Sequence, residues 1–218
     1  MTAPPTVGGG DLDQARTALA DGCVIAVLGG DVHHLAARRD RPDALTLLRA
    51  LERGPAPSVF EVVVGSRAQA RALASVWPKG AECLTERMWP GPLTVIVAIE
   101  AADALVPGDR ELHISMPKER LLRTLCRDAP LAVCALRHAD GSPMVDPDEV
   151  AARFTSRQIG LIVSGGTCAG PGPTIVDCTT SPPTVRHVGA LPETFVDAAL
   201  MMGNRRRHWF TRRSDPLR

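Results

Sequence analysis

Short apolar runs alternate with segments of helical periodicity along most of the chain. Apolar runs of strand length are bounded by turn residues, and they predict strands over residues 23–28, 58–65, 93–99, 111–115, 130–136, 159–163, 174–178 and 184–188. Segments with capping residues and a period near 3.6 predict helices over residues 11–22, 42–54, 66–77, 81–89, 117–126, 146–154 and 191–202. This alternation predicts a single α/β domain with a mostly buried sheet.

The stretch Trp-Pro-Gly-Pro at residues 89–92 stands directly before an apolar run. Each proline fixes its own φ and disfavours helical geometry in the residue before it. We therefore expect the helix through Met88 to end here and the chain to turn sharply into a buried strand at 93–99.

The remaining segments set the expected boundaries and location. Residues 1–10 are expected to be a flexible start, residues 11–202 the folded domain, and residues 203–218 an appended arginine-rich tail. No basic stretch followed by an apolar stretch begins the chain, and no apolar run reaches about eighteen residues, so we expect a cytoplasmic protein without a membrane partner.

Three motifs suggest chemistry but are better explained as structure. The glycine-rich segment 164–173 lacks the Gly-Lys-Ser/Thr ending of a phosphate-binding loop and precedes a strand instead of a helix. His33 and His34 have no acidic or cysteine neighbours at ligand spacing, so a loop or surface pair is expected and no metal site. Ser164 lacks the Gly-x-Ser-x-Gly context of a nucleophile and is expected to be a serine at a strand end.

The C-terminal segment 203–218 is strongly basic. It holds six arginines and one aspartate, a charge of +5, whereas the whole chain carries +1. Arginines next to aromatic residues neutralise phosphates and stack on bases. The RNA-contact candidates are therefore Arg205, Arg206, Arg207, Trp209, Arg212 and Arg213; a solvated end or a docking segment for a protein remain open alternatives.

Several ordered blocks resemble one known family. They are CVIAVLGGDVHHLAAR, ALERGPAPSVFEVVV, WPGPLTVIV, ELHISMP, PLAVCALRHADGSPMVDPDEV, GPGPTIVDC and VRHVGAL. In this order they resemble the YrdC family across about residues 12–191. The resemblance implies an α/β fold, a twisted mixed sheet flanked by helices, with a concave and positively lined groove.

The family resemblance also implies an activity and partners. A typical member is a threonylcarbamoyl-adenylate synthase that joins threonine, bicarbonate and ATP with loss of pyrophosphate. Its product goes to an enzyme that modifies an adenosine in tRNA, and members are described as binding double-stranded RNA. Such chemistry depends mainly on positioning and on cations that neutralise the polyphosphate.

The chain departs from the family at the substrate positions. The first substrate loop, rich in threonine and tyrosine, is matched by residues 28–35, which lack both residue types. The Lys-x-Arg-Pro-x-x-Lys cluster falls on Glu52, Gly54, Pro55 and Ser58, so its three cations are missing. A Ser-x-Ser-x-Asn strand end is matched by Val133, Ala135 and Arg137, Ser115 replaces an arginine, and only Thr174 remains of a Pro-Ser-Thr loop.

Two functional hypotheses follow from these departures. In the first, the protein is a non-catalytic or repurposed module that binds RNA, a nucleotide or another small anion. Its ligand-contact candidates are Gly29, Gly30, Arg53, Arg137, Thr174 and Arg186. In the second, it is still a synthase or a related carbamoyl-transfer enzyme that uses rearranged residues such as Arg53 and Arg137, and only then are ATP and magnesium expected. The missing cations favour the first hypothesis, because each charge-assisted contact contributes about 1.5 to 3 kcal/mol. The oligomeric state is left open.

Overall fold

The computed structural model describes residues 2–10, 12–29, 32–52, 60–165 and 171–211, with side chains described as far as residue 202. The strands are β1 (Thr6–Gly8), β2 (Ile25–Gly29), β3 (Val32–Arg38), β4 (Glu61–Val63), β5 (Leu93–Ala98), β6 (Glu111–Ser115), β7 (Leu131–Ala135), β8 (Leu161–Ser164), β9 (Thr174–Asp177) and β10 (Thr184–His187). The helices are α1 (Leu12–Ala20), α2 (Pro42–Leu51), α3 (Arg67–Leu73), α4 (Lys79–Met88), the 3-10 turn η1 (Ala101–Asp103), α5 (Arg120–Leu125), α6 (Pro147–Arg153) and α7 (Glu193–Thr211).

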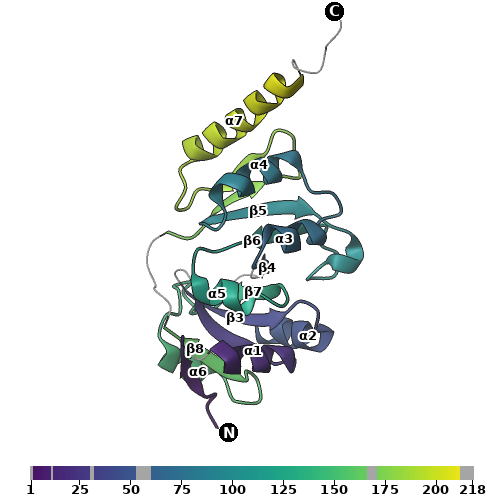
Figure 1. Cartoon of the computed structure of the whole chain (residues 1–218). Helices are drawn as coiled ribbons and strands as arrows, with labels where there is room; N and C mark the ends of the chain where they lie inside the picture. Colours follow the sequence, from purple (N-terminus) through teal and green to yellow (C-terminus); the bar gives the residue numbers. More distant parts are fainter. Residues whose placement is uncertain (1, 11, 30–31, 53–59, 166–170, 212–218) are drawn as a thin grey trace, which may run out of the picture.

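The strands of the described ranges form one twisted sheet in the order β1-β8-β2-β3-β7-β4-β6-β5-β9-β10 (Figure 1). Parallel pairs join β1 to β8, β8 to β2, β4 to β6 and β5 to β9, and the other neighbours are antiparallel. The sheet is therefore mixed, as the family resemblance implies. The described residues form a single α/β domain, which confirms the expected fold class.

Helices cover both faces of the sheet because the central strands are apolar on both sides. On β2, Ile25 and Val27 pack into one core cluster, and Ala26 packs into another. Helices α1 and α5 bury side chains in the first cluster, whereas α2, α3, α4, α6 and the start of α7 bury side chains in the second. The face covered by α1 and α5 carries the candidate site.

Two strands lie where the sequence predicts none. Thr6–Gly8 pairs with β8, so the expected flexible start contains strand β1. The loop expected around His33 and His34 is strand β3, which pairs with β2 and β7. The pairings of β1 with β8 and of β3 with β7 are non-local, whereas β3 and β2 form a hairpin. All three pairings stabilise segments whose own sequences are not strongly periodic.

The starts predicted for the helices over 66–77 and 146–154 are confirmed. Ser66 precedes α3 and its hydroxyl accepts a hydrogen bond from the Gln69 N–H. Asp146 precedes α6 in the same way, with Pro147 in its first turn. Pro117, in contrast, does not begin a helix, because α5 starts only at Arg120.

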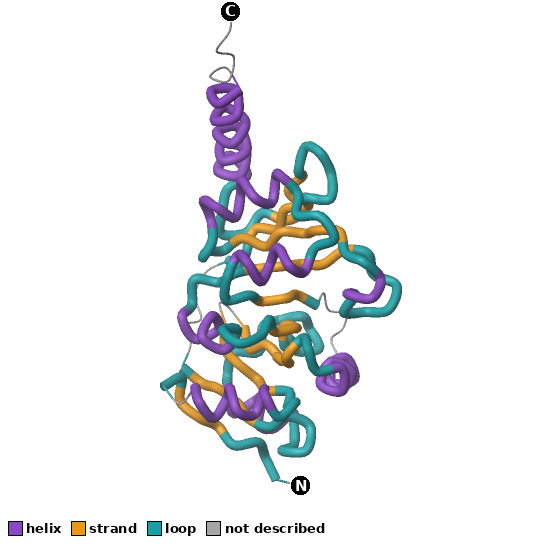
Figure 2. The backbone as a smooth tube through the Cα atoms, turned by 45° about the vertical axis from the view of Figure 1, so that its right-hand side comes forward, coloured by secondary structure: helices purple, strands orange, loops and turns teal. Residues whose placement is uncertain are grey.

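Helix α7 extends past the end predicted at residue 202 and reaches Thr211. Its first half packs against α4, where Val196 and Ala199 are buried. The helix then projects away from the body of the molecule (Figure 2). Within the described residues, no helix is long and apolar enough to cross a lipid bilayer.

Candidate functional site

A cavity of about 320 Å³ opens on the sheet face that α5 partly covers. Its floor and walls come from the strands, with Gly29, His34, Glu61, Val63, Ser115 and Val133. The segment before α5 supplies Pro117, Lys118 and Glu119, and α5 itself supplies Leu122. The rim is completed by Gly91 and Pro92, by residues 171–173 and by Ala190. This volume is that of a site for a small organic molecule.

The Trp-Pro-Gly-Pro corner forms one wall of this cavity. The Trp89–Pro90 peptide bond is cis, and the indole N–H of the buried Trp89 donates to the Leu93 carbonyl at 2.7 Å. The Gly91 N–H donates to the Met116 carbonyl at 3.0 Å, which ties the corner to the end of β6. The corner therefore ends α4, starts β5 and also shapes the cavity.

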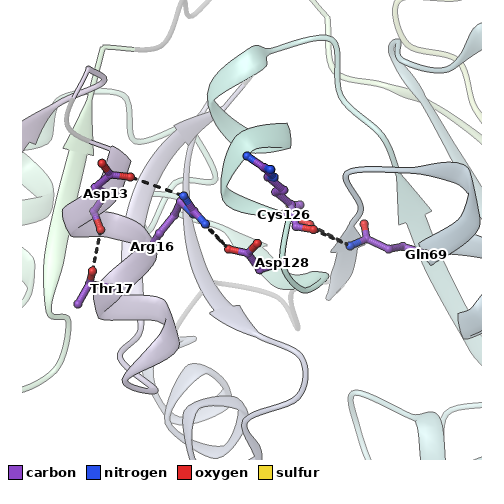
Figure 3. A network of polar contacts seen from close by, with 7 residues as sticks. Asp13, Arg16, Thr17, Gln69, Cys126 and Asp128 are labelled. Carbon is purple, nitrogen blue, oxygen red and sulfur yellow. Dashed lines mark hydrogen bonds and ion pairs between the residues drawn. The ribbon is translucent and has the colours of Figure 1, made fainter.

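Polar contacts at the C-terminal end of α5 join it to the helices α1 and α3 (Figure 3). Arg16 of α1 donates from Nη2 to the Asp128 carboxylate at 2.5 Å, just after α5. Gln69, near the start of α3, donates to the Cys126 carbonyl at 3.1 Å. These contacts fix the helix whose first turn lines the cavity.

Glu61 is the acidic group on the cavity floor. Its strand β4 lies between β6 and β7, with Glu61 opposite His113 and Val133. The Thr94 hydroxyl lies 3.4 Å from Glu61 Oε1, and the Ser115 hydroxyl also donates to the carboxyl group. Burial raises the pKa of Glu61, and the hydroxyls of Ser115 and Thr94 only partly offset that rise.

The described lining offers little positive charge. Lys118 is its one lysine or arginine within the described ranges, and it is exposed at the rim. Glu119 contributes a second acidic group beside it. None of the ion pairs among the described residues includes Glu61. The described part of the cavity therefore does not resemble a polyphosphate site, which requires several convergent cations.

Comparison with known proteins identifies the family. The model of the Sua5/YciO/YrdC family, described as "Telomere recombination", matches residues 17–189, which is more than half of the chain. The chain belongs to this family.

The relatives and solved structures agree with this assignment. A threonylcarbamoyl-AMP synthase of Bacillus subtilis (strain 168) is 26% identical over 86% of this chain and 56% of its own length. The crystal structure of Pyrococcus abyssi Sua5 complexed with L-threonine is similar with a TM-score of 0.77, at 23% identity over 91% of this chain and 61% of that one. Escherichia coli YciO gives a TM-score of 0.72 at 18% identity, over 88% of this chain and 98% of its own. The chain spans about half the length of the first curated relatives that it matches.

The cavity coincides with several positions where the YrdC family resemblance placed substrate residues. Gly29, Ser115 and Val133 line it, each at a position matched to a family substrate segment. Of the six ligand-contact candidates, Gly29 is thus placed in the cavity. Gly30 and Arg53 lie outside the described residues.

The other three ligand-contact candidates lie outside the cavity lining and serve local structure. Arg137 is exposed and donates to the Gly141 carbonyl at 3.1 Å. Thr174 is fully buried; its hydroxyl donates to the Leu191 carbonyl at 2.7 Å and accepts from the N–H groups of Gly189 and Leu191. These hydrogen bonds hold the turn that carries Ala190 to the cavity rim.

Arg186 pairs with a buried aspartate on the neighbouring strand. Its Nη2 lies 2.5 Å from Asp177 Oδ2 and its Nε lies 3.0 Å from the same oxygen. Burial of Asp177 opposes its ionisation, yet hydrogen bonds from Thr179 and Arg186 lower its pKa overall. Arg186 is therefore committed to joining β9 and β10, and it does not face the cavity.

The histidine pair is not the expected loop or surface pair. Both residues lie on β3, where successive side chains point to opposite faces. His33 is fully buried away from the cavity, and this burial lowers its pKa. His34 lines the cavity. Within the described residues, no group of three His, Cys, Asp or Glu residues could hold a metal ion.

Four residues of the cavity lining were not predicted from the sequence to be site residues: Glu61, His34, Lys118 and Glu119. A signal for Glu61 was available: it is one acidic residue inside the apolar run SVFEVVV, where strand burial makes an acid costly. The RNA-contact candidates Arg205, Arg206, Arg207 and Trp209 fall on α7, where side chains are not described, and Arg212 and Arg213 lie outside the described residues. Their role stays a prediction.

Proposed function

We propose that this protein is a YrdC-family member that uses the cavity as a small-molecule binding site and does not carry out ATP-dependent threonylcarbamoyl-AMP synthesis. The protein would then be related to tRNA modification either by descent alone or as a repurposed binding module. The observation that carries the proposal is the partly buried acid Glu61 on the floor of a cavity whose described lining offers one exposed lysine.

The charge balance supports this proposal. A triphosphate carries several negative charges, and Glu61 and Glu119 would repel them inside a partly dry cavity. Glu52, one of the positions matched to the family's cation cluster, is also acidic. Ser115 supplies a hydroxyl at the position matched to a family arginine, so it preserves hydrogen bonding without the charge.

The second candidate function is the synthase activity itself. The names of the Bacillus subtilis and Pyrococcus abyssi relatives favour it. It would require cations from elsewhere in the chain, with Arg53 and Arg137 as the sequence-based candidates. Arg137 lies outside the cavity lining and contacts the backbone of its own hairpin, so the described geometry supports the first candidate better.

Pyrophosphate release distinguishes the two candidates. The purified protein is given threonine, bicarbonate, ATP and magnesium, with the Bacillus subtilis relative as positive control. We expect no pyrophosphate above the enzyme-free background. Robust turnover by the wild-type protein would overturn the proposal, and a loss of that turnover in Arg53→Ala or Arg137→Ala would assign it to the rearranged residues.

A further inference from the structure

Glu61 places an acid inside an otherwise largely apolar cavity. Around it, the carbon skeletons of Val63, Val133 and Leu122 contribute apolar walls, and the prolines at 92, 117, 171 and 173 add more apolar surface. Glu61 is partly accessible, although its strand is covered on both sides by neighbouring strands. Its carboxyl group is thus presented to the cavity and not to bulk water.

The hydrogen bonds around this carboxyl leave acceptor capacity. An ionised carboxylate has about four lone-pair sites. Among the described residues, the hydroxyls of Thr94 and Ser115 supply its donors, the first of them at 3.4 Å from Oε1. As far as the described residues show, sites on the carboxylate are therefore left for a donor that enters the cavity.

A desolvated carboxylate without a cation is energetically unfavourable, and a positively charged ligand would relieve this cost. Desolvation penalises the charged form unless a partner of opposite charge or strong donors compensate. Within the described ranges the protein supplies hydroxyl donors and no ion pair to Glu61. An ammonium group would supply both the charge and the missing donors, whereas an anion would add repulsion.

We propose that the cavity binds a small organic amine, whose ammonium nitrogen pairs with the carboxylate of Glu61 and whose apolar carbon chain lies against Val63, Leu122 and Val133. This inference rests on the proposed binding function and names its ligand class. The remaining ionisable groups of the described lining are His34 on β3 and Lys118 and Glu119 before α5. Glu119 adds negative potential for a cation, and Lys118 is exposed at the rim, where it leaves the floor free.

The experiment uses three probes with the same five-carbon skeleton and different head groups. Isopentylamine is a cation, isopentanol is neutral and isovalerate is an anion at neutral pH. Binding to the full chain is measured by ligand-observed NMR titration or calorimetry at low ionic strength. The variants are Glu61→Gln, which keeps the shape of the side chain, and Glu111→Gln, a matched control on the exposed part of β6.

The inference predicts that wild-type protein binds isopentylamine at least ten-fold more tightly than isovalerate. In Glu61→Gln the affinity for isopentylamine should fall at least ten-fold, to about that for isopentanol, while isopentanol binding persists and shows that the cavity is intact. Glu111→Gln should behave like wild type.

Three results would overturn the inference: isovalerate binding as tightly as isopentylamine, an amine affinity unchanged in Glu61→Gln, or no binding of isopentylamine to wild type. None of these three results decides the proposed function, because pyrophosphate release is measured without the three probes. Conversely, pyrophosphate release would refute the proposed function even if the amine binds at Glu61.

Discussion

At the scale of single residues, the protonation state of Glu61 links the cavity to stability. Burial raises the pKa of Glu61 above its ordinary value near 4.5. In the unfolded chain the carboxyl ionises at that ordinary value, so between the two pKa values the folded protein binds more protons than the unfolded chain. The stability that the protonated carboxyl contributes is fully present at pH values below its pKa in the unfolded chain. It is lost as the pH rises through its higher pKa in the folded protein.

We therefore expect Glu61→Gln to match wild type in stability at acidic pH and to exceed it increasingly as pH rises. Glutamine resembles the protonated acid and has no charge to desolvate. The check is the free energy of unfolding from urea titrations at several pH values between about pH 4 and about pH 9, with Glu111→Gln as control. If the difference in unfolding free energy between wild type and Glu61→Gln stays constant with pH, that result would contradict the raised pKa of Glu61.

Matching single residues to the family pattern predicted some of the cavity lining but not which polar groups are available to a ligand. Ser115 and Val133 were identified as departures from the family pattern, and both line the cavity. Thr174 matched a family loop, but its hydroxyl is used by the backbone around residue 190. Matching a motif locates a residue in the fold, whereas hydrogen-bond partners decide whether its polar group is available to a ligand.

At the scale of elements, the corner at residues 89–92 was predictable because prolines restrict the backbone locally. Strand β3 was not, because it begins near two glycines and carries two histidines among small residues. Its strand geometry depends on the preceding strand β2, with which it forms a hairpin, and on β7, which comes from a distant part of the chain. The contribution of the corner to the cavity wall likewise depends on Met116, which the local sequence does not specify.

Gly91 is the position at which this corner is least tolerant of change. A Cβ added there would lie 2.1 Å from the Met88 carbonyl oxygen, a backbone atom that cannot rotate away. We expect Gly91→Ala to lower the free energy of unfolding by about 1 to 3 kcal/mol, the usual cost of overpacking. Urea unfolding measures this change.

Gly10→Ala is the matched control for Gly91→Ala. A Cβ at Gly10 meets no atom within 4 Å, and this glycine is exposed. Its substitution should leave stability nearly unchanged. Equal effects of the two substitutions would mean that the corner can relax and that steric crowding at Met88 is not the cause.

At the scale of the whole molecule, the order of the family blocks was enough to identify the fold, although the chain is only 26% identical to the Bacillus subtilis relative. The cavity was less predictable, since strand pairing brings together its lining residues from β4, β6 and β7. The chemistry at the cavity floor is less predictable than the cavity itself. A single acidic residue can reverse the ligand charge that the floor favours and leave the fold unchanged.

The basic C-terminal segment concerns the whole molecule because its net charge is opposite in sign to that of residues 1–202. With +1 for the whole chain and +5 for residues 203–218, residues 1–202 carry −4. We predict that deletion of residues 203–218 weakens binding to double-stranded RNA and makes the affinity less dependent on salt. Each phosphate contact that is lost should reduce the slope of log affinity against log salt by about 0.7 to 0.9. The deletion keeps Val196 and Ala199, so the packing of α7 on α4 should persist.

Charge is separated from length by a second variant of the same segment. Replacing Arg205, Arg206, Arg207, Arg212 and Arg213 by glutamine keeps every residue of the tail and removes five positive charges. Arg127→Gln with Arg157→Gln, both exposed on the body, is the control for a general change in charge. Electrophoretic mobility shifts at several salt concentrations should show the same loss in the deletion and the glutamine variant, and little change in the control. If affinity and salt slope are the same in all four proteins, the arginines do not contact RNA, and docking to a protein partner becomes the better explanation for a basic segment at the end of a projecting helix.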